Sequence, residues 1–145
     1  MSEDSPEEHV VLLVEDNRGD VRLAQEALKD RAYSLQAVAD GVEAMAYLKR
    51  EGSYESAPRV QLVLLDLNVP RKDGREVLAE IKNDPDLRRI PVVILSSSEA
   101  DSDINSVYDL GANAYVTKPI GFDKHMNTIR NICDFWLNIA RSPSA

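Results

Sequence analysis

Three things are scarce in this sequence, and each scarcity narrows what the protein can be. The single cysteine, Cys133, cannot form an internal disulfide, which fits a reducing compartment. No apolar run approaches the ~20 residues that a membrane-spanning helix needs. The acidic stretch 1–8 also lacks the basic and apolar regions of a signal peptide. We therefore expect a cytoplasmic protein that has no membrane partner.

Basic residues are the third scarcity. The chain has 17 Lys and Arg against 25 Asp and Glu, a formal charge of −8. Binding to nucleic acid through phosphates needs clustered Lys and Arg, so we expect no direct DNA binding. An acidic surface by itself indicates only solubility. Carboxylates gathered in one site, however, would attract a divalent cation.

The length allows one well-packed domain and is too short for two ordinary ones. The chain has 145 residues, of which 43% are hydrophobic and 29% charged, as in an ordinary globular protein. We predict an acidic tail over 1–8, one domain over 9–141 and a short tail over 142–145.

Short aliphatic runs alternate with segments that carry apolar residues at helical spacing. The run from Val60 to Leu65 is the densest and predicts a strand buried on both faces. The predicted strands are 9–14, 33–39, 60–65, 90–95 and 114–117, and the helical stripes are 19–30, 42–48, 77–81, 104–110 and 122–136. This order predicts an α/β fold, a doubly wound five-stranded parallel sheet with right-handed crossovers.

Polar residues stand where four of the predicted strands end. Asp66 follows the central strand, and because burying an unpaired carboxylate is costly, we expect it just past the strand's end. The carboxyl ends of parallel strands lie along one edge, where ligands bind. The other residues at that edge are Glu15, Asp16, Ser96 and Lys118. Three carboxylates and a hydroxyl suit Mg²⁺, which keeps water and phosphate oxygens as further ligands.

This pattern resembles the receiver domain of two-component response regulators over essentially the whole chain. The matching features are Glu15-Asp16, Asp66, Ser96, Tyr115 and Lys118-Pro119, with the spacings from Asp66 to Ser96 and Lys118. The resemblance implies a flavodoxin-like sheet of order 2-1-3-4-5 with five helices on two faces. The chain departs from many relatives in having Glu-Asp for Asp-Asp and Ser96 where threonine is common; both changes keep the chemistry.

The resemblance also implies a role for each of these residues. Asp66 would take a phosphoryl group from a phosphohistidine of a sensor histidine kinase, assisted by Lys118 and Ser96. Mg²⁺ would be held by Asp16, Asp66 and the carbonyl of Asn68, with Glu15 acting through water. Such a protein is no turnover enzyme; it catalyses only its own phosphorylation and dephosphorylation.

Further expectations concern signal output. Ser96 and Tyr115 would act as the switch, and Asn68 and Ser98 would tune the lifetime of the phosphate. The bond before Pro119 is cis in the family.

Finer features resemble stand-alone regulators paired with bacterial phytochromes, namely the segments 50–54, 73–78, 84–87 and 134–137. Members of that group often form homodimers through the fourth helix, fifth strand and fifth helix. A stand-alone receiver would pass its signal by contact or to a downstream phosphotransfer protein. The residues that we expect at such a surface are Tyr108, Tyr115, Phe135 and Trp136. Equally, Phe135 and Trp136 could simply cover the edge of the sheet.

Two other classes compete with the receiver interpretation. A phosphohydrolase of the haloacid-dehalogenase type also uses an aspartate at a strand end, but it needs a second aspartate two residues later, where this chain has Asn68. A binding module of the same fold, or a receiver that is not phosphorylated, is the second alternative. The loop 15–20 is acidic and lacks a phosphate-cradling glycine-rich turn, and the intact acidic pocket argues for phosphorylation.

Overall fold

Five strands and five α-helices alternate along the chain, in a computed structural model that describes residues 9–141 and 143. The predicted tails, 1–8 and 142–145, lie outside the described residues except for residue 143. The strands are β1 (His9–Val14), β2 (Tyr33–Val38), β3 (Leu62–Leu65), β4 (Val92–Ser96) and β5 (Ala114–Thr117). The helices are α1 (Arg18–Leu28), α2 (Gly41–Lys49), α3 (Gly74–Asn83), α4 (Asp101–Asp109) and α5 (Phe122–Asp134), with a 3₁₀ turn η1 (Gly52–Tyr54) and a π-helical turn η2 (Phe135–Ile139).

The strands form one parallel sheet in the order β2-β1-β3-β4-β5, which confirms the predicted fold class and strand order. The register pairs Leu13 with Leu64 and Leu64 with Val93. All four residues of β3 are buried, as expected for a central strand covered on both faces. The sheet therefore carries the core on both of its sides.

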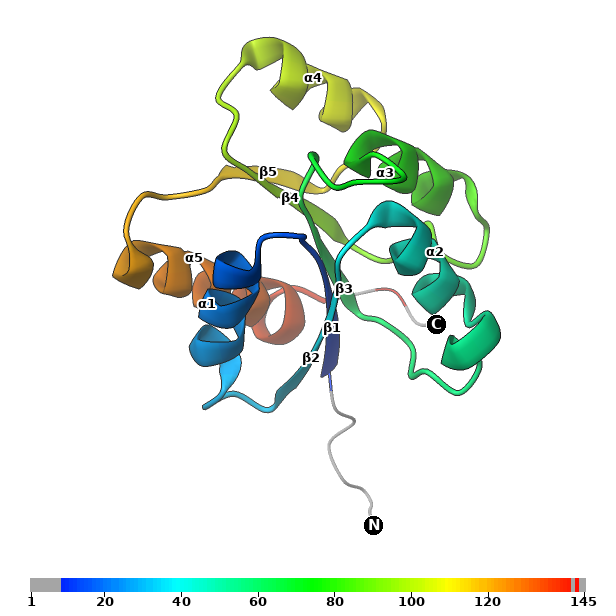
Figure 1. The fold of residues 1–145 in the computed structure, drawn as a ribbon, viewed down its shortest axis with the longest axis horizontal. Helices are drawn as coiled ribbons and strands as arrows, with labels where there is room; N and C mark the ends of the chain where they lie inside the picture. The colour runs from blue at the N-terminus through cyan, green and yellow to red at the C-terminus, as the bar shows by residue number, and fades with distance from the viewer. Residues whose placement is uncertain (1–8, 142, 144–145) are drawn as a thin grey trace.

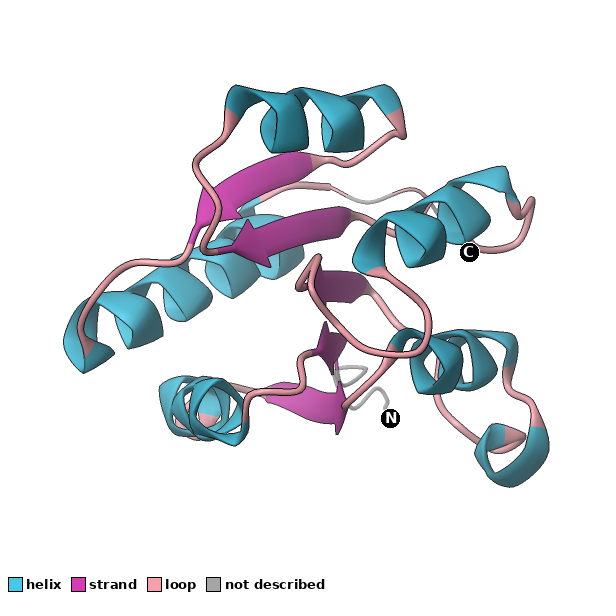
Figure 2. Ribbon diagram, turned by 45° about the horizontal axis from the view of Figure 1, so that its top comes forward, coloured by secondary structure: helices cyan, strands magenta, loops and turns pink. Residues whose placement is uncertain are grey.

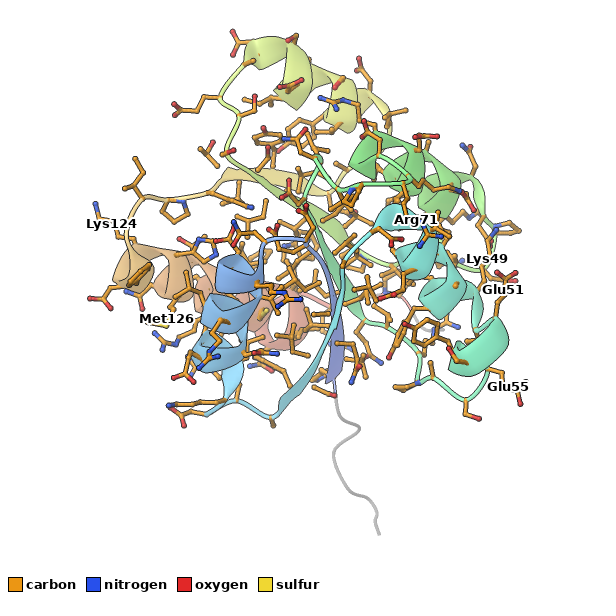
Figure 3. All side chains as sticks on the ribbon, viewed as in Figure 1. Lys49, Glu51, Glu55, Arg71, Lys124 and Met126 are labelled. Atoms are coloured by element: carbon orange, nitrogen blue, oxygen red, sulfur yellow. The ribbon has the colours of Figure 1, made fainter. Side chains whose placement is uncertain are left out.

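Helices cover the two faces of the sheet unequally (Figures 1 and 2). One face packs against α1 and α5, through residues such as Leu13, Leu64 and Ile129. The other packs against α2, α3 and α4, through residues such as Leu12 and Leu65. Neighbouring residues of a strand point to opposite faces, which explains why adjacent leucines belong to different core clusters. Side chains fill the space on both faces, whereas Lys49, Glu51 and Lys124 point away from the sheet (Figure 3).

Acidic and amide side chains begin three of the helices. Asn17 accepts from the Asp20 N–H at the start of α1, and Asp40 accepts from the Glu43 N–H at the start of α2. Asp73 starts α3 with a capping box completed by Glu76. Because each cap stands directly after a strand or its loop, the helix starts are set at the carboxyl edge of the sheet.

The ends of two helices add detail to the sequence prediction. Helix α2 ends at Lys49, one residue past the predicted stripe 42–48, because Arg50 adopts the left-handed conformation (φ 57°) and its N–H bonds back to the carbonyl of Tyr47. A 3₁₀ turn then begins at Gly52. The predicted last helix divides into α5 and the π-turn η2. No helix of residues 9–141 is long and apolar enough to cross a membrane.

The start of α3 lies very close to the end of β3. The Gly74 N–H donates to the carbonyl of Leu67 at 3.0 Å. A Cβ at Gly74 would lie 2.6 Å from the carbonyl oxygen of Asp66 and 2.7 Å from the Cα of Leu67. Only glycine fits this approach, so α3 begins directly against the backbone that presents the Asp66 side chain.

Candidate functional site

Three carboxylates meet at the carboxyl edge of the sheet. Glu15 and Asp16 follow β1, Asp66 follows β3, and one oxygen of each lies within 4.8 Å of the others. Glu15 and Asp66 are buried, with 4% and 8% of their surfaces exposed, whereas Asp16 is exposed. A hard cation with oxygen ligands fits this set, because it offsets their mutual repulsion and keeps open positions toward solvent.

The ammonium group of Lys118, just after β5, reaches three carboxylates at once. Its Nζ lies 2.7 Å from Glu15 Oε1, 2.8 Å from Asp20 Oδ2 and 3.1 Å from Asp66 Oδ2. Asp20 was not predicted from the sequence. The available signal was its place as an acidic residue in the first turn of α1, which starts at the same edge of the sheet.

Burial and charge shift the pKa values in this group. Burial raises the pKa of Glu15 to about 7, opposed by the hydrogen bond from Lys118 and assisted by the charge of Asp66. Burial lowers the pKa of Lys118, but the hydrogen bonds to Asp20 and Glu15 outweigh it, so the net shift is upward. Lys118 is therefore a permanent cation. Burial lowers the pKa of His125 of α5, opposed by the charge of Asp20 and assisted by the charge of Lys118.

Backbone N–H groups orient two of the carboxylates. The Asn68 N–H donates to Asp66 Oδ1 at 3.1 Å, and the Asn17 N–H donates to Glu15 Oε2 at 3.1 Å. Each carboxylate therefore has one oxygen bonded to backbone and the other bonded to Lys118. Asn68 is exposed beside Asp66, at the position where its carbonyl was expected to hold a metal.

The structure connects Ser96 to Lys118 through the backbone. Ser96 ends β4 and is fully buried. Its carbonyl accepts from the Lys118 N–H at 2.7 Å, and its hydroxyl oxygen accepts from the Ser98 N–H at 3.2 Å. The ends of β4 and β5 are thus tied together beside Asp66.

Tyr115 and Ser98 are bonded to each other. The Tyr115 hydroxyl donates to the Ser98 carbonyl at 2.7 Å, and the Tyr115 N–H donates to the hydroxyl of Tyr108 at 3.1 Å. The Ser98 hydroxyl donates to Asp103 of α4. Ser98 therefore anchors the β4–α4 loop in this structure, and its effect on phosphate lifetime stays a prediction.

The residues expected at a dimer surface differ in how far they are exposed to solvent. Tyr108 and Phe135 are 48% and 46% exposed. Trp136 packs against the α1–α5 side of the core and meets the Phe135 ring edge-on, with centroids 5.3 Å apart. Trp136 therefore belongs in part to the core on the α1–α5 side, and both the dimer surface and the homodimer stay predictions.

The expectation that the peptide bond before Pro119 is cis is wrong for this structure. The described residues contain no cis peptide bond, so Lys118 and Pro119 are joined in trans.

Comparison with known proteins defines the class of this fold and site. The family model of the response regulator receiver domain matches residues 11–130. The chain belongs to this family, whose members are phosphoacceptors of signal transduction and in general not enzymes.

Particular relatives match over nearly the whole chain. The response regulator Rcp1 of Synechocystis sp. is 47% identical over 147 aligned residues, which cover 100% of this chain and 100% of Rcp1. The crystal structure of the phosphorylated cyanobacterial phytochrome response regulator RcpA has a TM-score of 0.91 and 51% identity, covering 94% of this chain and 99% of that one. The Mn²⁺-bound form of Rcp1 has a TM-score of 0.88 at 47% identity, with the same coverage.

These matches settle the general function. The protein is a response-regulator receiver homologous to phytochrome response regulators, a group that receives phosphate from histidine kinases. Divalent-metal binding is a property of the family, and the acidic cluster needed for it is present in this chain.

Proposed function

We propose that Asp66 is the phosphoacceptor of this receiver and that Mg²⁺ is its metal. The observation that carries the proposal is the convergence on Asp66 of one ammonium and two further carboxylates, with Lys118 Nζ at 3.1 Å from Asp66 Oδ2. Receiver chemistry needs a carboxylate nucleophile, a cation to neutralise it and a fixed positive charge for the phosphoryl oxygens. A candidate nucleophile, a fixed ammonium group and a set of carboxylates that could hold the cation lie together at one edge of the sheet.

The reaction is an in-line transfer. An Asp66 oxygen forms a bond to phosphorus while the bond from phosphorus to the donor's imidazole nitrogen breaks, and the nitrogen takes up a proton. Mg²⁺ held by Asp16, Asp66, the Asn68 carbonyl and, through water, Glu15 would supply charge neutralisation at the phosphoryl oxygens.

Lys118 and Ser96 act on the same phosphoryl group. Lys118 pairs its ammonium with a phosphoryl oxygen, exchanging one of its carboxylate partners. The Ser96 hydroxyl, held at the end of β4, donates to another oxygen. Water later cleaves the aspartyl phosphate at a rate tuned by the side chains at Asn68 and Ser98.

The donor that we propose is a phosphohistidine of a phytochrome-type sensor kinase, which is supported by the likeness to Rcp1 and RcpA. Output would pass through a changed surface around α4 and β5, to a homodimer partner or a downstream phosphotransfer protein. The cytoplasmic location and the absence of DNA and membrane partners stay predictions.

The alternatives fit less well. A phosphohydrolase needs an acid two residues after Asp66, and Asn68 there cannot donate a proton as an acid. A non-phosphorylated module would have no use for a lysine buried against three carboxylates, because each of these charges is costly to desolvate.

The test is intact mass after incubation with acetyl phosphate. We expect a gain of one phosphoryl group that requires Mg²⁺ and is lost in Asp66→Asn, while Asp101→Asn, an exposed acid in α4, behaves as wild type. Asp16→Asn should need more Mg²⁺ for the same yield. Wild type that neither gains mass nor takes phosphate from a panel of kinases would overturn the assignment.

The homodimer needs its own measurement. Light scattering with and without phosphorylation should give the mass of two chains in at least one state, reduced to one chain by Tyr108→Ser or Phe135→Ser. One chain in both states at high micromolar concentration would exclude it.

A further inference from the structure

An ion pair joins the first turns of α3 and α4. Arg75 is the second residue of α3 and Asp103 the third residue of α4. Arg75 Nη2 lies 2.5 Å from Asp103 Oδ1, and each side chain is 32% exposed. This pair connects the two helices directly.

The second oxygen of Asp103 extends the connection to the β4–α4 loop. The Ser98 hydroxyl donates to Asp103 Oδ2 at 2.5 Å and accepts from the Ala100 N–H at 3.2 Å. One carboxylate therefore joins a helix α3 cation to a loop hydroxyl. Ser98 is fixed at its side chain by Asp103 and at its N–H by Ser96.

The same residue, Ser98, receives the hydroxyl of Tyr115 on its carbonyl at 2.7 Å. A continuous chain of polar contacts therefore runs from α3 to the aromatic residue of β5. Its members in order are Arg75, Asp103, Ser98 and Tyr115.

The α3 end of this chain of contacts lies next to the backbone of Asp66. Helix α3 starts at Gly74, whose N–H bonds to the Leu67 carbonyl and whose Cα leaves no room for a side chain against the Asp66 backbone. Arg75 is the next residue. The ion pair therefore spans the two loops that flank Asp66, one after β3 and one after β4.

We propose that Arg75 and Asp103 are positioning residues: their ion pair fixes Ser98 and thereby holds the Tyr115 hydroxyl against the Ser98 carbonyl. A tyrosine hydroxyl that bonds to a loop carbonyl keeps its orientation only while the loop keeps its place. No side-chain cap holds this loop, because the N-cap residue of α4 is Ala100, whose side chain cannot accept a hydrogen bond. The Asp103 contacts restrain it instead.

The size of the effect follows from the partial exposure of the pair. Ion pairs of this exposure shift a two-state equilibrium about twofold to fivefold. Breaking the pair should therefore increase the fraction of Tyr115 that is turned away from Ser98 by about that factor. The inference concerns the unphosphorylated protein and rests on the proposed function only for its kinetic consequence.

The experiment uses ¹⁹F NMR of the full chain labelled with 3-fluorotyrosine, with the Tyr115 signal assigned from Tyr115→Phe. The H₂O/D₂O solvent shift of that signal reports its exposure. We expect Arg75→Met and Asp103→Asn to raise the exposed fraction about twofold to fivefold, and the double variant to add little. Arg75→Lys, which keeps the charge, should restore most of the wild-type value.

Matched controls separate positioning from loss of structure. Asp101→Asn removes an acid from the same turn of α4 and should leave the Tyr115 signal unchanged. Circular dichroism should match wild type in every variant. A Tyr115 signal that is the same in Arg75→Met and Asp103→Asn as in wild type, or that moves equally in Asp101→Asn, overturns the proposal.

Phosphorylation supplies the second readout. With acetyl phosphate and Mg²⁺, the phosphorylation rate of Arg75→Met should differ from wild type by the same factor as the exposed fraction of Tyr115 does. In Arg75→Lys the phosphorylation rate should return to the wild-type value. If wild type takes phosphate neither from acetyl phosphate nor from a panel of kinases, the proposed function fails while the ¹⁹F result still decides this inference. A changed rate with an unchanged Tyr115 signal counts against the positioning role.

Discussion

At the scale of single residues, the site is built around a surplus of negative charge. Lys118 is shared by Glu15, Asp20 and Asp66, so its one positive charge faces three carboxylates. On the proposed mechanism, phosphorylation of Asp66 would add more negative charge beside the same lysine. Lys118 would then leave one of its partners, and Asp20 would be the easiest to release because it is the most exposed of the three acids.

Asp20→Asn should speed phosphorylation. The substitution removes a negative charge near the incoming phosphate and weakens a ground-state bond to Lys118, so we expect the initial rate with acetyl phosphate to rise about twofold to fivefold. Asp30→Asn, beyond the end of the same helix, is the matched control. A slower rate would mean that Asp20 holds Lys118 in its working position.

His125 makes stability depend on pH. Burial lowers the pKa of His125 in the folded protein below its unfolded value near 6.5. As pH falls through this range, the unfolded chain takes up more protons at His125 than the folded protein does. Protonation of His125 therefore lowers the free energy of unfolding as pH falls. Glu15, with a raised pKa, acts in the opposite sense. We therefore compare wild type with His125→Gln by urea unfolding.

The free energy of unfolding of wild type relative to His125→Gln should decrease between pH 7.5 and 5.5. Because both proteins contain Glu15, the difference between their free energies of unfolding cancels the pH dependence that Glu15 contributes. An identical difference at the two pH values would show that His125 is protonated equally in the folded and unfolded states.

At the scale of elements, polar residues after the strands cap the helices that surround the site. Asn17, Asp40 and Asp73 each cap a helix at the edge where Asp66 lies. Each cap bonds to an N–H group no more than three residues later, so its position can be predicted from the nearby sequence. The close contact between α3 and the Asp66 backbone cannot, because it depends on how β3 and α3 pack.

Gly74→Ala should destabilise the protein and slow phosphorylation. Its Cβ would meet backbone atoms at 2.6 and 2.7 Å, so α3 must move or the Asp66 loop must distort. We expect a loss of about 1–3 kcal/mol in urea unfolding, and a lower rate with acetyl phosphate.

Gly52→Ala is the comparison for this prediction. Gly52 has a positive φ of 59° and open space around it, so only backbone strain applies there. It should cost about 1 kcal/mol and leave the phosphorylation rate unchanged. Equal phosphorylation rates in wild type and Gly74→Ala would show that the Asp66 loop absorbs the clash without moving the Asp66 carboxylate.

At the scale of the whole molecule, a two-sided core supports one charged edge. Apolar contacts on both faces of the sheet hold the strand ends in place, so the carboxylates cannot separate to relieve their repulsion. A bound cation relieves it, and binding that favours the folded state adds to stability.

Mg²⁺ should therefore raise the free energy of unfolding. At a concentration 100-fold above its dissociation constant the gain is about 2.7 kcal/mol, and it should fall strongly in Asp66→Asn. NaCl at equal ionic strength is the control, because a net charge of −8 is itself screened by salt. The same gain with NaCl as with Mg²⁺ would indicate screening alone.

The sequence by itself determined the order of the elements, the parallel sheet and the polar residues at its carboxyl edge. These features follow from hydrophobic period and turn chemistry, which act over a few residues. The resemblance carried by Glu15-Asp16, Asp66, Ser96 and Lys118-Pro119 added the strand order and the family.

Only the tertiary structure decided which side chains share which partners. Lys118 and Glu15 stand 103 positions apart in the chain and meet at 2.7 Å, and Asp20 joins them because α1 turns back over the same edge. The pairing of Arg75 with Asp103 and the packing of Trp136 against the α1–α5 side depend in the same way on helix packing. Distances between elements come from how the whole core packs, and no local pattern encodes them.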